Sequence, residues 1–333
     1  MAKPDRLALD VLVTRGSLVE SRHRVHAAVV DASGVLVASA GNAALVTFWR
    51  SCAKPVQVLP LVRNGGLERF KWGEEELALA CGSHGGEPEH IAVAARMLAS
   101  LGLEEGDLAC GPSEPLSRRG AELAKDAGSG ISRLHNNCSG KHAGMLARAK
   151  LAGWPTEGYQ RADHPVQREA REEVAQWSGM TPNAIPIGVD GCGVSVFALP
   201  LTAMAYAYAR FGDAIQKGVE HVSRVGAAMR NHPFMIGGTE RFDTILSEET
   251  GGRLIAKVGA EGVHSVMIPE RGLGLVTKVE DGTLRAQHTA VIAALHQIGE
   301  LPDPLSDRLA GYVHRLVKNT RNEVVGELRP DVW

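Results

Sequence analysis

Both ends of the chain carry the alternating pattern of apolar and polar residues that is typical of half-buried strands. The residues from Leu7 to Val13 alternate in this way. The apolar runs 25–30 and 35–38 flank turn-forming residues, which predicts a hairpin. Short apolar runs bounded by turns return within 253–279, so this part of the chain also predicts strands.

The middle of the chain has the longer apolar periodicity of helices. The segments expected to be helical are 74–80, 88–101, 121–127, 143–151, 165–177, 199–211 and 213–229, with a further helix at 289–298. A short apolar strand is expected at 185–189, between the fifth and sixth of these helices.

This order of elements predicts an α+β fold in a single domain that spans the 333 residues. The sheet part is expected to comprise about 1–70 and 185–333, and a helical insertion about 71–184. Short turns join the expected strands, so the sheet should be mainly antiparallel and flanked by helices.

Charge and composition narrow the class of partner. The chain has 36 Lys and Arg against 38 Asp and Glu, a net charge of -2. Such balance gives no basic surface for nucleic acid or membrane, so a small-molecule substrate is expected. No apolar stretch is long enough to span a membrane, and no apolar segment follows the charged N-terminus as in a secretory signal. The odd count of 5 Cys favours reduced thiols in the cytoplasm.

The first group of residues with catalytic potential is Ser51-Cys52-Ala53-Lys54. At the start of a helix, the i, i+3 spacing places Ser51 and Lys54 on one face. A serine hydroxyl needs an adjacent base to become a nucleophile, and a neutral lysine can act as that base. Taken alone, the same pattern is compatible with a helix-capping serine and a solvated lysine.

Two further segments carry a serine and a lysine. Ser83 stands in Cys81-Gly82-Ser83-His84, where small neighbours let a substrate approach the backbone closely. Lys257 lies on or just after an expected strand and resembles the strand-borne lysine of S-x-x-K hydrolases. Each segment alone is also compatible with an ordinary turn or a solvated charge.

Two polar clusters complete the set of candidates. Asn137-Cys138-Ser139-Gly140-Lys141-His142 precedes an apolar helix, and Asp190-Gly191-Cys192-Gly193 follows the short apolar strand. The two cysteines can converge in space. Their spacing alone does not predict a metal site, because two thiolates do not complete a tetrahedral zinc shell.

Together these segments resemble the L-asparaginase II family of the Rhizobium etli type, the serine–lysine class of asparaginases. The segments that carry the resemblance are Arg50-Ser51-Cys52-Ala53-Lys54-Pro55, Cys81-Gly82-Ser83-His84, Asn137-Cys138-Ser139-Gly140-Lys141-His142, Asp190-Gly191-Cys192-Gly193 and Lys257-Val258-Gly259-Ala260-Glu261-Gly262. They occur in family order and span most of the chain.

The resemblance implies a fold similar to β-lactamases and penicillin-binding proteins, usually in a homodimer. It implies two serine–lysine pairs, Ser51 with Lys54 and Ser83 with Lys257. Some members hold zinc through two cysteines and a lysine. The matching zinc ligands here are Cys138, Lys141 and Cys192, and the matching substrate-binding residues are Arg50, His142 and Asp190.

The chain also departs from the family pattern near both serines. Cys52 stands where a second serine is common, and Gly82 and Gly85 stand where Ala and Ser are expected. These departures bear on rate and substrate range more than on the type of reaction.

The resulting hypothesis is hydrolysis of L-asparagine to L-aspartate and ammonia. Ser51 would form a β-aspartyl ester with Lys54 as base, and Ser83 with Lys257 would relay protons or activate water. Two alternatives remain: a glutaminase or another serine–lysine hydrolase, and a non-catalytic protein that binds zinc or an amino acid.

Overall fold

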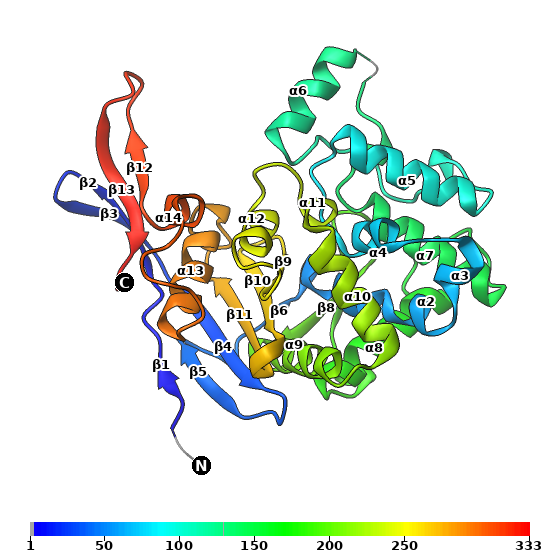
Figure 1. The fold of residues 1–333 in the computed structure, drawn as a ribbon, viewed down its shortest axis with the longest axis horizontal. Helices are drawn as coiled ribbons and strands as arrows, with labels where there is room; N and C mark the ends of the chain where they lie inside the picture. The colour runs from blue at the N-terminus through cyan, green and yellow to red at the C-terminus, as the bar shows by residue number, and fades with distance from the viewer. Residues whose placement is uncertain (1–2, 129) are drawn as a thin grey trace.

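The main sheet of the molecule has six strands, and they come from both ends of the chain (Figure 1). The computed structural model describes residues 3–128 and 130–333. In sheet order the strands are β1 (Asp5–Arg6), β5 (Leu36–Ala40), β4 (Val25–Asp31), β11 (Leu273–Val279), β10 (Val263–Ile268) and β9 (Ile255–Val258). All neighbours pair antiparallel except β1 and β5. The predicted α+β fold, with a mainly antiparallel sheet drawn from both chain ends and flanked by helices, is therefore confirmed.

Two smaller sheets lie beside the main one. The first contains β12 (Arg315–Lys318), β13 (Val324–Pro330), β2 (Val11–Arg15) and β3 (Leu18–His23), and the second contains β6 (Val46–Phe48), β8 (Ser195–Pro200) and β7 (Ile187–Val189). The strand predicted at 7–13 forms only from Val11 onward. The sequence pattern missed β12, which is largely exposed, and β13, which is mostly half-buried; neither has a continuous apolar face.

The helices cover both faces of the main sheet and form a separate layer beside it (Figure 1). They are α1 (Lys54–Gln57), α2 (Leu59–Arg63), α3 (Gly66–Phe70), α4 (Glu74–Cys81), α5 (Pro88–Ser100), α6 (Arg118–Ala127), α7 (Ser139–Ala152), α8 (Pro165–Ser178), α9 (Leu201–Gln216), α10 (Glu220–Asn231), α11 (Pro233–Ile236), α12 (Phe242–Glu249), α13 (Leu284–Gln297) and α14 (Asp307–Val313). A short 3₁₀ helix, η1 (Arg50–Ala53), precedes α1.

Local residues explain why the helices begin and end where they do. His164 caps α8 by accepting the N–H of Val166, and Pro165 occupies the first turn. Gly218, with φ 69°, lies in the break between α9 and α10 and accounts for the two separate helices. Helix α13 starts earlier than predicted, because the side chain of Thr283 caps it by accepting the N–H of Arg285.

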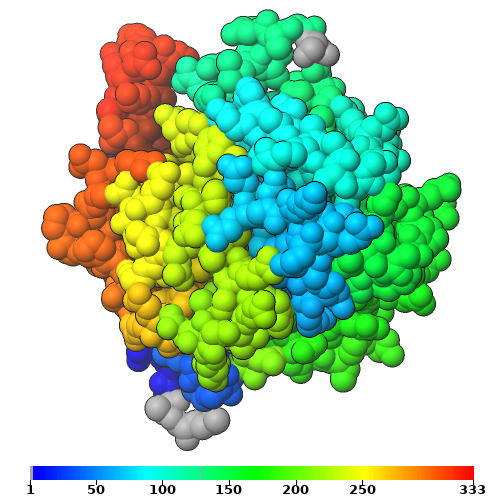
Figure 2. All heavy atoms as spheres, turned by 45° about the vertical axis from the view of Figure 1, so that its right-hand side comes forward, coloured from blue at the N-terminus to red at the C-terminus, as the bar shows by residue number. Residues whose placement is uncertain are grey.

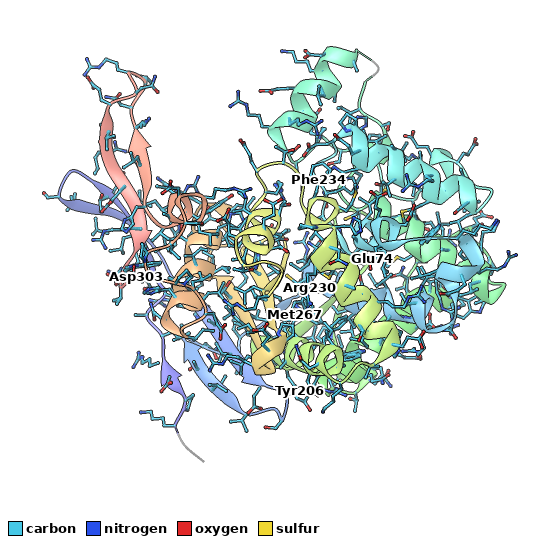
Figure 3. The ribbon with its side chains drawn as sticks, viewed as in Figure 1. Glu74, Tyr206, Arg230, Phe234, Met267 and Asp303 are labelled. Carbon is cyan, nitrogen blue, oxygen red and sulfur yellow. The ribbon has the colours of Figure 1, made fainter. Side chains whose placement is uncertain are left out.

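Helix α9 connects the sheet to the helical layer. It packs closely on β11 because Gly274 has no side chain, and a Cβ there would lie 2.0 Å from the carbonyl oxygen of Ala205. Tyr206 of α9 and Met267 of β10 lie where sheet and helices meet (Figure 3). Along β11, Val276 belongs to the core on this side and Leu275 to the core under α13, as strand alternation requires.

The part of the chain that the structure describes has no helix long and apolar enough to cross a membrane. Helices α4 to α8 fall within the predicted helical insertion. The boundaries of that insertion stay a prediction, as does the homodimer.

Candidate active site

Ser51 lies in η1, the turn that leads directly into α1. Two buried hydrogen bonds hold the residues on either side of it. The indole Nε1 of Trp49 donates to Ser265 Oγ at 3.1 Å, and the hydroxyl of Tyr208 donates to the carbonyl of Cys52 at 2.7 Å. The backbone around Ser51 is thus fixed against both the sheet and α9.

Arg50, the residue before Ser51, has a left-handed backbone with φ 53°. A non-glycine residue in this region is uncommon and is often found at functional sites. Its side chain pairs with Asp190 after β7, with Nε and Nη2 at 2.9 and 2.8 Å from Oδ1. Burial would raise the pKa of Asp190, but Lys141 and Arg50 hold it below its usual value. Asp190 therefore stays ionised.

Lys54 is almost completely buried beneath Ser51. Its Nζ donates to Ser83 Oγ at 3.1 Å, to the carbonyl of Asn137 at 3.3 Å and to the carbonyl of Gly82. Among the described residues, the hydroxyl of Ser51 has no hydrogen bond to Lys54. Burial lowers the pKa of Lys54, which favours the neutral amine that a general base requires.

The second lysine, Lys257, contacts the same Ser83 hydroxyl as Lys54. Lys257 Nζ, reaching in from β9, donates to Ser83 Oγ at 2.9 Å and to the carbonyl of Val258 at 2.7 Å. Burial, together with the charge of Lys54, lowers the pKa of Lys257 to about 8. The Ser83 hydroxyl thus contacts two buried amines whose pKa values are both lowered by burial.

Asp243 of α12 lies close to Lys257. The sequence pattern did not predict a role for it. Its carboxylate accepts the N–H of Val258 at 2.8 Å and contacts His264 Nε2 at 2.8 Å. Burial would raise the pKa of Asp243, but His264 holds it well below the usual value. The resulting negative charge partly offsets the lowering of the Lys257 pKa. No local motif marks Asp243, because the fold alone brings it to β9.

The structure brings the two cysteines next to each other. Cys138 at the start of α7 neighbours Cys192 after β7, and Lys141 Nζ donates to Cys192 Sγ at 2.9 Å. Contact with Cys192 and the charge of Lys141 lower the pKa of Cys138 well below the usual thiol value. One thiolate charge is therefore stabilised within the cluster.

These residues suit zinc, which prefers nitrogen and sulfur ligands. No group of three or more His, Cys, Asp or Glu in residues 3–128 and 130–333 could hold a metal, so Lys141 is needed as the third ligand. Burial would lower the pKa of Lys141, but the sulfurs of Cys138 and Cys192 raise it above its usual value. Zinc binding would therefore have to release the Lys141 proton.

His142 is fully buried and has one ring nitrogen without a hydrogen-bond partner among the described residues. Its Nδ1 lies 2.5 Å from the hydroxyl of Tyr159, which already accepts the N–H of Ala109 at 2.9 Å. The Tyr159 proton therefore goes to Nδ1, and the neutral ring carries its own proton on Nε2. Burial lowers the pKa of His142 well below its usual value, so the ring stays neutral. The buried Nε2 has no partner in the structure and is a hydrogen-bond donor free to meet a ligand.

Steric limits explain the two glycine departures. A Cβ at Gly82 would lie 2.5 Å from the carbonyl oxygen of Met235, and one at Gly85 would lie 2.7 Å from Ser117 Cβ. Alanine or serine therefore does not fit at these positions here. Cys52, the third departure, is fully buried and donates to the carbonyl of Lys257 at 3.0 Å. Burial raises its pKa to about 12, so the thiol is no nucleophile.

Comparison of the fold with solved structures gives distant similarities. The protein "Mglu in its native form" has a TM-score of 0.46 and 14% identity over 89% of this chain and 69% of that one. A β-lactamase from Mycobacterium bovis has a TM-score of 0.42 and 15% identity over 82% and 94%. Simvastatin synthase from Aspergillus terreus has a TM-score of 0.37 and 13% identity over 83% and 93%. No curated protein sequence matches the chain.

The sequence profile of the family described as L-asparaginase II matches residues 11–330. That span contains every residue of the site described above and nearly the whole chain. The Rhizobium etli type within the family stays a prediction. The chain belongs to the L-asparaginase II family and is an enzyme of asparaginase-type amide hydrolysis.

Proposed function

We propose that the enzyme hydrolyses L-asparagine to L-aspartate and ammonia, with Ser51 as nucleophile and Lys54 as its base. The observation that carries this proposal is the contact of one hydroxyl, Ser83 Oγ, with the side-chain nitrogens of both Lys54 and Lys257. It supports a chain of groups that can exchange a proton inside a closed site.

In the first half of the reaction, Ser51 Oγ attacks the side-chain amide carbon of the substrate. The hydroxyl proton passes to neutral Lys54, and the amide oxygen becomes an oxyanion held by backbone N–H groups near Ser51. The C–N bond then breaks, Lys54 returns the proton to the leaving nitrogen, and ammonia leaves. The β-aspartyl ester on Ser51 remains.

In the second half, water attacks the ester carbon. Its proton is taken up by the amines that Ser83 connects, Lys54 and Lys257. The bond between the carbonyl carbon and Ser51 Oγ breaks, and Ser51 regains a proton from the same relay. L-Aspartate leaves and the site returns to its starting state. Both halves require a neutral lysine, which the lowered pKa values of Lys54 and Lys257 favour.

The charges of Arg50 and Asp190 suit a zwitterionic substrate. Arg50 would pair with the α-carboxylate and Asp190 with the α-ammonium, while the two remain in contact with each other. The free Nε2–H of His142 would donate to the substrate. Zinc, held by Cys138, Lys141 and Cys192, would order the pocket as a structural metal.

Ammonia release from L-asparagine tests the proposal, with L-glutamine as the competing substrate. The wild type should release ammonia faster from L-asparagine, and Ser51→Ala should lose about a thousandfold or more of kcat. Ser17→Ala, in the exposed turn between β2 and β3, is the control and should keep full activity. Turnover retained in Ser51→Ala contradicts the role of Ser51, and faster turnover of L-glutamine contradicts the assigned substrate.

A further inference from the structure

A cavity of about 310 Å³ lies among α12, α13 and α14. None of the proposed catalytic residues lines it. Its wall includes Arg241, Arg315, Tyr312 and Leu284, as well as the stacked rings of Phe242 and His288. Figure 2 shows the red C-terminal residues and the blue-green residues standing apart at the top of the molecule, with yellow residues between them. The volume falls at the lower end of the range for small-molecule sites.

Two arginines in this wall lack an acidic partner. Arg241 Nη1 donates to the carbonyl of Leu116 at 3.3 Å, and Arg315 Nη1 donates to the carbonyl of Arg285 at 3.2 Å. Within the described chain, neither guanidinium has a carboxylate oxygen within 4.0 Å. Each guanidinium has five N–H donors, so most of them remain available. Burial lowers the pKa of half-buried Arg241, which reflects an incompletely solvated cation.

The two acidic residues of the wall do not neutralise this charge by contact. Asp243 already binds His264 and the N–H of Val258. Glu240 is exposed, and its carboxylate makes no ion pair among the residues that the structure describes. The cavity wall therefore includes two guanidinium groups that have no carboxylate partner among the described residues, and each can pair with an anion.

The rest of the wall is apolar and aromatic. The rings of Phe242 and His288 stack with centroids 4.4 Å apart, and Tyr312 packs edge-on against Phe242 at 5.0 Å. Leu284 is 62% exposed beside them. This surface suits the apolar part of an organic ligand better than an inorganic ion. Contact with apolar side chains contributes no binding free energy to a fully hydrated ion.

We propose that this cavity is a binding site for a small organic carboxylate, whose carboxylate pairs with Arg241 and Arg315 and whose body lies against Phe242, His288 and Leu284. The proposal does not depend on the proposed function, because none of the four serine and lysine residues assigned to catalysis lines this cavity.

Benzoate is the probe, measured by isothermal titration calorimetry with the whole chain. It should bind with one-to-one stoichiometry, and Arg241→Gln and Arg315→Gln should each weaken it about tenfold. Arg308→Gln, which removes a surface arginine paired with Glu248 and Glu249, is the matched control and should leave the affinity unchanged. Glu240→Gln should strengthen binding, since it removes a nearby negative charge.

Three further measurements complete the test. Benzyl alcohol, the neutral analogue, and inorganic phosphate should both bind more weakly than benzoate. Arg50→Gln should retain benzoate binding, which separates this cavity from the active site. The proposal is overturned if benzoate does not bind, if phosphate binds more tightly, or if a folded Arg241→Gln, Arg315→Gln double variant binds as the wild type does.

Discussion

The side-chain nitrogen of Lys257 lies 2.9 Å from the hydroxyl oxygen of Ser83, although the two residues are 174 positions apart in the chain. Strand β9 supplies the lysine, and the loop after α4 supplies the serine. Lys54 reaches the same hydroxyl from α1, at 3.1 Å. Three distant segments thus meet at one hydroxyl, and in the proposed mechanism the pKa of Lys257 determines when they can relay a proton.

The pH dependence of kcat should follow the titration of Lys257, because this lysine acts in the proposed hydrolysis of the ester. The neutral amine is the active form, and its pKa is lowered to about 8 by burial and by the charge of Lys54. Activity should therefore rise with pH and level off above about 8. A series of kcat values for L-asparagine from acidic to basic pH checks this. A profile that stays flat through this region contradicts the assignment.

Lys257→Met should be inactive but more stable than the wild type near neutral pH. Below about 8 the wild type must bury a charged amine, whereas an unfolded lysine titrates at 10.5. Between these values the unfolded chain binds more protons, so the free energy of unfolding of the wild type rises with pH. The gain from methionine should be on the order of 2 kcal/mol below pH 8 and should shrink above it.

Urea unfolding at neutral pH and near pH 10 measures this difference. Lys257→Arg, which keeps the charge, is the control and should show no gain in stability. A Lys257→Met variant that is less stable than the wild type at neutral pH would mean that burial of this lysine carries little cost.

Gly82→Ala should lower both activity and stability. The added Cβ would lie 2.5 Å from the carbonyl oxygen of Met235, so the backbone beside Ser83 must move. Loss of the Ser83 geometry should reduce kcat about tenfold or more, with a fall in Tm. Gly111→Ala, where a Cβ meets nothing within 4 Å, should leave both unchanged. Equal behaviour of the two variants would contradict the steric account.

The sequence was informative where side chains repeat with a clear period or where chemical groups cluster. The hairpin at 25–38 and the long central helices could be predicted from apolar spacing alone. Strands β12 and β13 could not be predicted, because neither presents a continuous apolar face. The pairing of β13 with β2 depends on contacts between the two chain ends.

In the candidate site, too, the sequence predicted the local motifs but not the long-range contacts. Its five motifs were visible in the sequence, but the hydrogen bonds among them were not. The spacing of Ser51 and Lys54 suggested a direct contact, whereas Lys54 donates to Ser83 in the structure. Asp243 and Tyr159 act on Lys257 and His142 only through the folded chain. No periodicity or local motif encodes such long-range contacts. The cytoplasmic location stays a prediction.

Zinc content should depend on both cysteines of the cluster. The wild type should bind one zinc ion, and Cys138→Ser with Cys192→Ser should bind none, because two of the three proposed ligands are lost. Chelation of the wild type should lower its Tm, since the metal binds only the folded state. Cys110→Ser, at a buried cysteine outside the set, should keep its zinc. Elemental analysis that finds equal zinc in all three proteins contradicts the ligand assignment.

The identity of the acylated residue tests the account most directly. L-Asparagine is mixed with Lys257→Met, in which loss of the relay should slow hydrolysis of the ester, and the reaction is quenched in acid. Intact mass and peptide mapping then locate any covalent aspartyl group. An adduct on the peptide that contains Ser51, absent in the Ser51→Ala, Lys257→Met variant, is the predicted result. An adduct on Ser83, or one that persists without Ser51, would contradict the account.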